Sequence, residues 1–220
     1  MTQNWRLQLI YSDQPMPSPE KARELAQTLD GIERVYYAHR STDSDRAAMW
    51  TRDPLKLNLQ GRIAIDLNHE LTAIEQAEIV ELLGGRPYLC ERHEPLSLSL
   101  GPAETFEGTV QICCFRKLRS ISEEQLTERW LEQHTPIALE TQCTVGYIQN
   151  RVRRSTDPLF DAIVEEYFPP AAATSAAVFF NAPNDPELMK ANIARMTQST
   201  ARFLELATAE VIHLSDTRIL

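Results

Sequence analysis

The order of strands and helices occurs twice along this chain, and that repetition constrains the fold more than any other feature. Alternating apolar residues predict strands at 5–11, 32–40, 61–67 and 87–92, and helix-start signals predict helices at 18–29 and 72–83. From residue 109 the same β-α-β-β-α-β order begins again, with a strand at 109–115 and a helix that Ser122 and Gln125 open as a capping box. Each half therefore reads as a ferredoxin-like unit, whose helices cover one face of its sheet and whose other face needs a partner.

Two sequence matches support the duplication. The predicted caps Ser18 and Ser122 are 104 positions apart, and the tetrapeptide RSTD recurs at Arg40 and Arg154, 114 positions apart. The second half thus has extra residues, 135–144, between its first helix and second strand. We predict an α+β protein whose tandem ferredoxin-like repeats, residues 1–104 and 105–220, form a pseudo-dimeric α+β barrel. Gly101 and Pro102 interrupt both periodicities at the boundary.

Composition narrows the classes of function. The chain has 220 residues, 31 acidic and 22 basic, for a net charge of −9, and no dense Lys/Arg run that would bind a nucleic acid. No apolar stretch is long enough to span a membrane and no secretion signal is visible, so we expect a cytoplasmic protein with small-molecule partners. The four cysteines lack zinc-site spacing and are expected to be reduced, mostly buried thiols. Nucleotide-loop, serine-elbow and zinc-helix motifs are absent.

The remaining elements of the second half follow from the same signals. Strands are predicted at 143–152 and 159–168, a short helix after Pro170, and a longer helix capped by Asp185 whose Met189, Ile193 and Met196 face inward. A last strand, 209–214, contains His213. His39, His69 and His213 are isolated in sequence and are interpreted as solvated or strand-end residues.

Three motifs of the second half resemble the EthD-like family of the dimeric α+β barrel superfamily. They are RWLEQHTP (129–136), GYIQNRV (146–152) and FDAIVEEYF (160–168), followed by a similar last helix and strand. The first half keeps the element order but has Ala26 and Asp30 where Trp130 and His134 would fall, so it resembles a degenerate copy. The resemblance implies a role in the degradation of small organic compounds, in oxidoreductase-linked chemistry or in decarboxylation and dehydration, with ligands held between sheet and helices.

His134 is the predicted catalytic residue. Helical spacing puts Leu126, Trp130 and His134 on one stripe, so the tryptophan and the histidine face the sheet if the leucine does. An inward histidine at the last turn of a helix, followed by a proline, can reach a pKa near neutrality and transfer protons. The alternative is that His134 only caps the helix end and packs on Trp130.

Trp130, Tyr147 and Asp161 are the predicted substrate-binding residues. Tyr147 shares one face of its strand with Gln149 and Arg151, but the sequence does not tell whether that face meets the helices or the barrel interior. The alternatives are a sheet tyrosine with its hydroxyl at the rim, and an Asp161 paired with a nearby arginine.

Three functional hypotheses follow. The first is an enzyme that works without a cofactor on a small apolar or aromatic compound in a pocket between helix and sheet, by proton transfer or by an oxygenase-like reaction. Haem fits less well, because one inward histidine is its sole candidate ligand. The second is a non-catalytic ligand-binding or accessory protein of an oxidoreductase system, and the third is a purely structural duplicated domain. Exposed edges leave a homodimer open.

Overall fold

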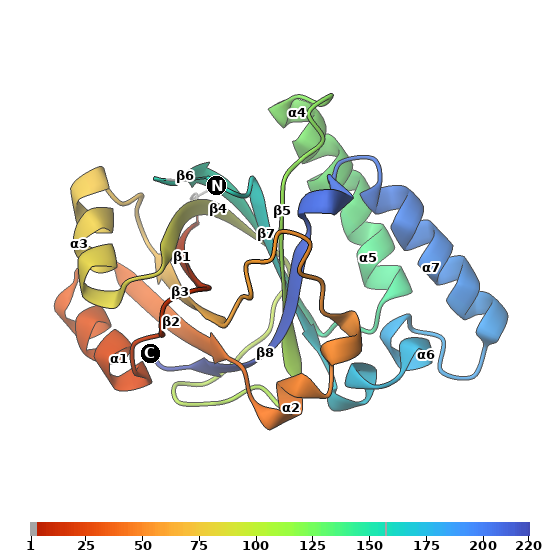
Figure 1. Cartoon of the computed structure of the whole chain (residues 1–220), viewed down its shortest axis with the longest axis horizontal. Coiled ribbons are helices and arrows are strands. Elements are labelled where there is room, and N and C mark those ends of the chain that lie inside the picture. The colour runs from red at the N-terminus through yellow and green to blue at the C-terminus, as the bar shows by residue number, and fades with distance from the viewer. Residues whose placement is uncertain (1–3, 157) are drawn as a thin grey trace.

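Eight antiparallel strands close into one barrel in the computed structural model, which describes residues 4–156 and 158–220 (Figure 1). The strands are β1 (Trp5–Tyr11), β2 (Ile32–His39), β3 (Gly61–Leu67), β4 (Arg86–Leu96), β5 (Thr109–Phe115), β6 (Gly146–Arg154), β7 (Ala162–Phe168) and β8 (Glu210–Arg218). Around the barrel they follow the order β1-β3-β2-β8-β5-β7-β6-β4. The predicted fold class, an α+β barrel, is confirmed.

The two halves of the chain contribute the same strand order. The first half forms β4-β1-β3-β2 and the second forms β8-β5-β7-β6, and the pairs β2–β8 and β4–β6 join them. Each half-sheet would have two unpaired edges alone, and joining them removes all four. This order is the one that two ferredoxin-like units give, whereas the domain boundary near residue 104 stays a prediction.

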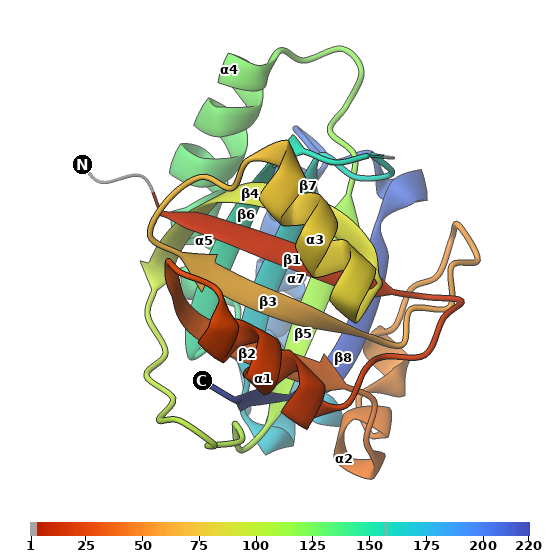
Figure 2. The same cartoon turned by 90° about the vertical axis from the view of Figure 1, so that its left-hand side faces the viewer.

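Helices cover the outside of the barrel on two opposite sides. The helical elements are α1 (Pro19–Thr28), α2 (Thr42–Asp45), η1 (Ala48–Trp50), α3 (Ala73–Leu83), α4 (Glu123–Leu126), η2 (Thr127–His134), α5 (Thr135–Thr141), η3 (Pro170–Ala173), α6 (Ala176–Phe179), α7 (Pro186–Thr200) and η4 (Leu206–Thr208). Figure 2 shows α1 and α3 lying across the outer face of the first half. On the opposite side, η2 and α5 lie over the second half, and α7 packs mainly against them as an outer layer (Figure 1).

The predicted helix starts are confirmed. Ser18, Thr72, Ser122 and Asp185 each accept a backbone hydrogen bond as N-caps, and Thr72/Glu75 and Ser122/Gln125 form complete capping boxes. Each cap pairs backbone donors that the first helical turn cannot satisfy internally. Local side-chain chemistry therefore fixes these starts, independently of tertiary packing.

The expected helix end at His134 is wrong. The helix that begins at Glu123 widens into the π-helical segment η2 and continues through Pro136 as α5 to Thr141, so His134 lies in its middle. Proline has no N–H, and in a π-helical pattern the carbonyl five residues earlier, that of Leu131, loses its donor. The Thr135 hydroxyl donates to this carbonyl at 2.7 Å. The helix therefore takes up most of the extra segment 135–144.

The expected inward stripe of α7 is wrong at Ile193, which is 37% exposed. The buried positions of this helix are instead polar, Asn192 and Ser199. Asn192 donates to the Phe180 carbonyl at 2.7 Å, and Ser199 bonds His134. Because α7 packs on other helices and not chiefly on a strand surface, its buried face is narrow and satisfied by side-chain hydrogen bonds.

The barrel interior holds an ion network beside an apolar cluster. Arg6 and Arg62, from β1 and β3, both bind the Glu165 carboxylate of β7, at 2.5 and 2.7 Å. Arg6 also binds Asp66 at 2.5 Å and Arg62 binds Asp216 at 2.8 Å. Burial opposes ionisation of Glu165, but the charges of Arg6 and Arg62 outweigh it and keep its pKa below the usual value. This network crosses from one half of the chain to the other.

Candidate functional site

A row of polar side chains crosses the outer, helix-facing side of the second half-sheet. Strand register places Tyr147 of β6 opposite Glu166 of β7, Glu166 opposite Gln111 of β5, and Gln111 opposite His213 of β8. Directly opposed side chains lie about 5 Å apart at their Cβ atoms, so these four form one continuous line. We call Tyr147, Glu166, Gln111 and His213 the polar row.

Hydrogen bonds run along the polar row in one direction. The Gln111 amide donates to Glu166 Oε2 at 2.9 Å, which leaves Gln111 Oε1 to accept from His213 Nε2 at 3.2 Å. With its Nε2 protonated, neutral His213 can only accept at Nδ1, where the Thr109 hydroxyl lies at 3.0 Å. Every donor thus points toward the carboxyl group, which orients the amide and fixes the histidine tautomer.

Burial shifts the pKa values of the two titratable groups in this hydrogen-bonded series, Glu166 and His213. Glu166 is 6% exposed, and burial raises its pKa to about 7, with the Gln111 hydrogen bond opposing the rise. Burial lowers the pKa of His213 to about 4, so the imidazole is neutral at pH 7. No residue that the structure describes donates a hydrogen bond to Glu166 Oε1. The row therefore contains a carboxyl group that changes charge near neutral pH and has one free oxygen.

The polar row ends at Tyr147, which is also one of the predicted substrate-binding residues. The Tyr147 side chain faces the helices, and its hydroxyl accepts a hydrogen bond from the Trp130 ring and another from Gln149 at 3.1 Å. Burial, and next the charge of Glu166, raise the pKa of Tyr147 well above its usual value. Trp130 packs edge-on against Phe115. The structure thus brings Trp130 and Tyr147 together in the helix–sheet layer.

His134 lies in the same layer but is not part of the row. Its Nδ1 lies 2.9 Å from the Ser199 hydroxyl, and its ring packs edge-on against Phe203. Burial lowers the pKa of His134 to about 4, rather than leaving it near neutrality as expected at a helix end. Since His134 is mid-helix, no helix-end carbonyls stabilise its charged form. Ser199, the hydrogen-bond partner of His134, lines a cavity of about 230 Å³ between α5 and α7.

Asp161 is set apart from these groups. Its carboxylate accepts the Lys117 backbone N–H at 2.9 Å just before β7, so it fixes a turn and is not paired with an arginine as its alternative interpretation proposed. The sequence patterns did not indicate Glu166 or His213 as site residues, and His213 is 3% exposed, not solvated. Side chains alternate between the two faces of a strand, but this alternation shows that Glu166 and Tyr147 share a face only when the pairing of their strands is known.

The described part of the chain shows neither a cluster of metal ligands nor a helix that could cross a membrane. Residues 4–156 and 158–220 contain no group of three or more His, Cys, Asp or Glu side chains placed to hold a metal ion. None of their helices is long and apolar enough to cross a membrane. The four cysteines are unpaired thiols, and Cys90 and Cys114 are buried.

Comparison with solved structures identifies the fold. An anthrone oxidase-like protein superposes with a TM-score of 0.52 at 13% identity, covering 100% of this chain and 92% of that one. A putative monooxygenase from Lactobacillus acidophilus also matches, with a TM-score of 0.46 at 7% identity, covering 100% of this chain and 95% of that one. The chlorite dismutase of Candidatus Nitrospira defluvii matches with a TM-score of 0.44 at 11% identity, covering 97% of this chain and 91% of that one. No family model and no curated protein matches the sequence. The chain shares its fold with the anthrone oxidase-like protein, at a sequence distance that shows the fold alone.

Proposed function

We propose that this protein is a cofactor-free acid/base enzyme of small-molecule metabolism, of the EthD-like kind that its motifs resemble, with Glu166 as the proton-transferring group. The observation that supports it is a buried carboxyl group with a pKa of about 7 in the helix–sheet layer. Such a pKa lets the group both accept and release a proton at neutral pH, which is where general acid/base catalysis is most efficient.

The other members of the row have positioning roles in this proposal. Gln111 holds one carboxyl oxygen and leaves Oε1 for a substrate proton, and neutral His213 keeps Gln111 in that orientation. In this proposal a small apolar or aromatic compound packs against Trp130 and Tyr147, which belong to the apolar cluster of the same layer. Proton removal from such a compound fits dehydration and the activation of a substrate toward oxygen, and proton delivery to carbon as CO2 leaves fits decarboxylation; the row does not distinguish among them.

His134 remains a second candidate for the same role. Its contact with Ser199 connects it to the cavity between α5 and α7, and its pKa of about 4 makes it a neutral acceptor at pH 7. A non-catalytic protein that only binds a ligand in this layer is the competing function. Replacing Glu166 and His134 separately distinguishes these possibilities.

Proton exchange with solvent tests the proposal whatever the product of the full reaction is. Small aromatic and phenolic acids and their lactones are incubated with the protein in D2O, and deuterium incorporation at carbon is followed by proton NMR. We expect catalysed exchange that falls by roughly 100-fold or more in Glu166→Gln. Glu210→Gln is the matched control, because Glu210 is a buried carboxyl with a pKa also raised to about 7 but outside the polar row.

Two outcomes contradict this assignment. Equal exchange rates in the wild type and in Glu166→Gln would remove Glu166 from the chemistry, and loss in His134→Gln instead would give the role to His134. Ligands that raise the melting temperature of both proteins with no exchange in either would favour the binding protein.

A further inference from the structure

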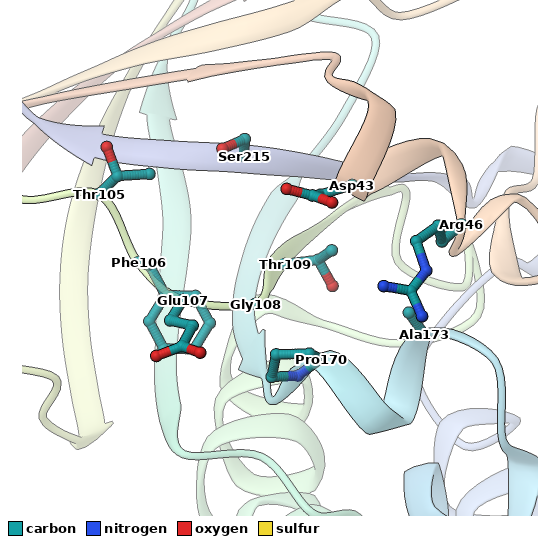
Figure 3. A pocket seen from close by; sticks show the side chains of 10 residues that line it. All are labelled: Asp43, Arg46, Thr105, Phe106, Glu107, Gly108, Thr109, Pro170, Ala173 and Ser215. Carbon is teal, nitrogen blue, oxygen red and sulfur yellow. The ribbon is translucent and has the colours of Figure 1, made fainter.

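A second cavity, of about 290 Å³, lies at one end of the barrel and is outside the helix–sheet layer of the proposed active site. It is formed by α2 and the residue after it, the segment leading into β5, η3 and β8. Figure 3 shows Asp43 and Arg46 on one side of it, Ser215 of β8 along its upper edge, Thr109 in the middle, and Pro170 and Ala173 from η3 below. Its volume is at the small end for ligand pockets, which suits a compact molecule.

Three charged side chains line this cavity without forming an ion pair with any residue that the structure describes. Arg46 and Asp43 are three residues apart, a spacing at which opposite charges commonly pair on a helix. They do not pair here, and neither these two nor Glu107 makes a side-chain hydrogen bond with a residue in the described part of the chain. One positive and two negative groups are therefore available to a ligand.

The remaining wall is apolar and held in place by the backbone. Phe106 and Pro170 contribute ring surface, and Phe106 packs edge-on against Tyr167 at 5.2 Å between ring centres. Gly108 has φ +145°, and a Cβ there would lie 2.2 Å from the Phe168 carbonyl oxygen. The segment from Phe106 to Thr109 can therefore approach β7 this closely only with glycine at position 108. The wall is thus preformed.

We propose that this cavity binds a small zwitterion, an amino acid or a close analogue with an apolar side chain. Arg46 binds the carboxylate, for which its planar guanidinium offers two parallel N–H donors. Asp43 attracts the ammonium group, and Phe106 and Pro170 contact the apolar side chain. A simple anion is disfavoured by the Asp43 carboxylate, and a simple cation leaves Arg46 without a partner. This site does not depend on Glu166 being catalytic.

Three probes with the same phenyl body test the charge requirement. Binding of phenylalanine, 3-phenylpropionate and 2-phenylethylamine to the full chain is measured by isothermal titration calorimetry. We expect phenylalanine to bind roughly tenfold or more tightly than either singly charged probe, because each removes one charge-assisted contact. Arg46→Gln should remove the advantage over 2-phenylethylamine, and Asp43→Asn should reduce the advantage over 3-phenylpropionate.

The controls separate this site from the proposed active site. Arg195→Gln removes an exposed arginine at the cavity between α5 and α7 and should leave phenylalanine binding unchanged. Glu166→Gln should also leave it unchanged, so this inference and the catalytic proposal can fail separately. Absence of saturable phenylalanine binding, equal affinity for 3-phenylpropionate, or unchanged binding in Arg46→Gln would each overturn the zwitterion site. Arg46 and Asp43 are exposed, so both variants are expected to fold.

Discussion

Burial shifts the pKa values of the carboxyl and imidazole groups in the helix–sheet layer in opposite directions, and in both cases it favours the neutral form. His134 and His213 each have a pKa near 4 in the folded chain, against 6.5 when unperturbed. Glu166 has a pKa near 7, against 4.5. At pH 7 the layer therefore contains two neutral histidines and one carboxyl group at its midpoint, which is a favourable composition for proton transfer.

Acidification should destabilise the protein through the two histidines. Between pH 6.5 and 4 the unfolded chain binds more protons than the folded one, so the free energy of unfolding falls as the pH falls through this window. Each histidine contributes about 3 kcal/mol to the loss, from a shift of about 2.5 units. Urea unfolding across this range should show a weaker dependence in His213→Gln and in His134→Gln. His69→Gln, at a half-exposed histidine, is the control, and equal slopes in all four proteins would be inconsistent with burial as the cause.

Glu166→Gln should stabilise the protein at alkaline pH. The folded pKa of Glu166 is raised, so its contribution is present below pH 4.5 and is lost as the pH rises through 7. Glutamine resembles the neutral carboxyl and avoids that loss, which amounts to about 3 kcal/mol at most. Urea unfolding at pH 5 and pH 8.5 measures the difference. A variant no more stable than the wild type at pH 8.5 would show that the carboxyl is already solvated or paired.

At the residue scale the sequence predicted Trp130 and His134 as inward groups and Tyr147 as a substrate-binding residue on a face it left open, and all three are buried. It could not predict the polar row. Glu166 and His213 lie 47 positions apart and meet through Gln111 of a third strand, so their contact depends on strand order and register, which parity alone does not give. His213 looked solvated because no neighbour in sequence reveals that helices cover its strand.

At the scale of elements, the long helix of the second half depends on one hydroxyl group. Thr135→Ala should destabilise the protein by about 1 kcal/mol, because the Leu131 carbonyl then loses its donor next to Pro136. Thr141 donates to the Ile137 carbonyl at the same 2.7 Å, but no proline follows within that turn, so Thr141→Ala is the matched control and should cost less. Melting temperatures measure both. Equal losses would mean that the hydroxyl does not compensate for the proline.

Helix starts and helix ends differ in how far the sequence predicts them. Capping residues act on backbone groups within three positions, so Ser18, Thr72 and Ser122 were sufficient to predict their starts. A proline normally indicates an end, yet Pro136 lies inside a helix because a π-helical segment and the Thr135 hydroxyl accommodate it. The outward position of Ile193 likewise depends on which neighbour α7 packs against.

At the scale of the whole molecule, the ion network holds the two halves of the barrel in register. Glu165 of the second half binds Arg6 and Arg62 of the first, and all three side chains are fully buried. The repeated element order predicted that two sheets must meet, since each alone leaves two edges and a bare face. It did not predict a charged interior, because alternate residues of β1, such as Arg6 and Gln8, look like an outward polar face.

Glu165→Gln should destabilise the protein by about 3 to 5 kcal/mol, because it leaves two buried guanidinium groups without their shared partner. Chemical denaturation measures the loss. Glu187→Gln breaks the exposed pair with Lys190 and should change stability by less than about 1 kcal/mol. A small effect at Glu165, comparable to that at Glu187, would show that strand pairing and apolar contacts hold the halves together without the ion network.

The ionisation of Glu166 tests the central claim most directly. Carbon-13 NMR of protein labelled at the glutamate side-chain carboxyl would follow each carboxyl from pH 4 to pH 9, with Glu166→Gln and Glu210→Gln to assign the two buried groups. We predict a carboxyl that titrates with a midpoint near 7 and disappears in Glu166→Gln. A Glu166 signal that is fully ionised by pH 5.5 would contradict the account, because the polar row would then be a fixed structural network with no proton to transfer at neutral pH.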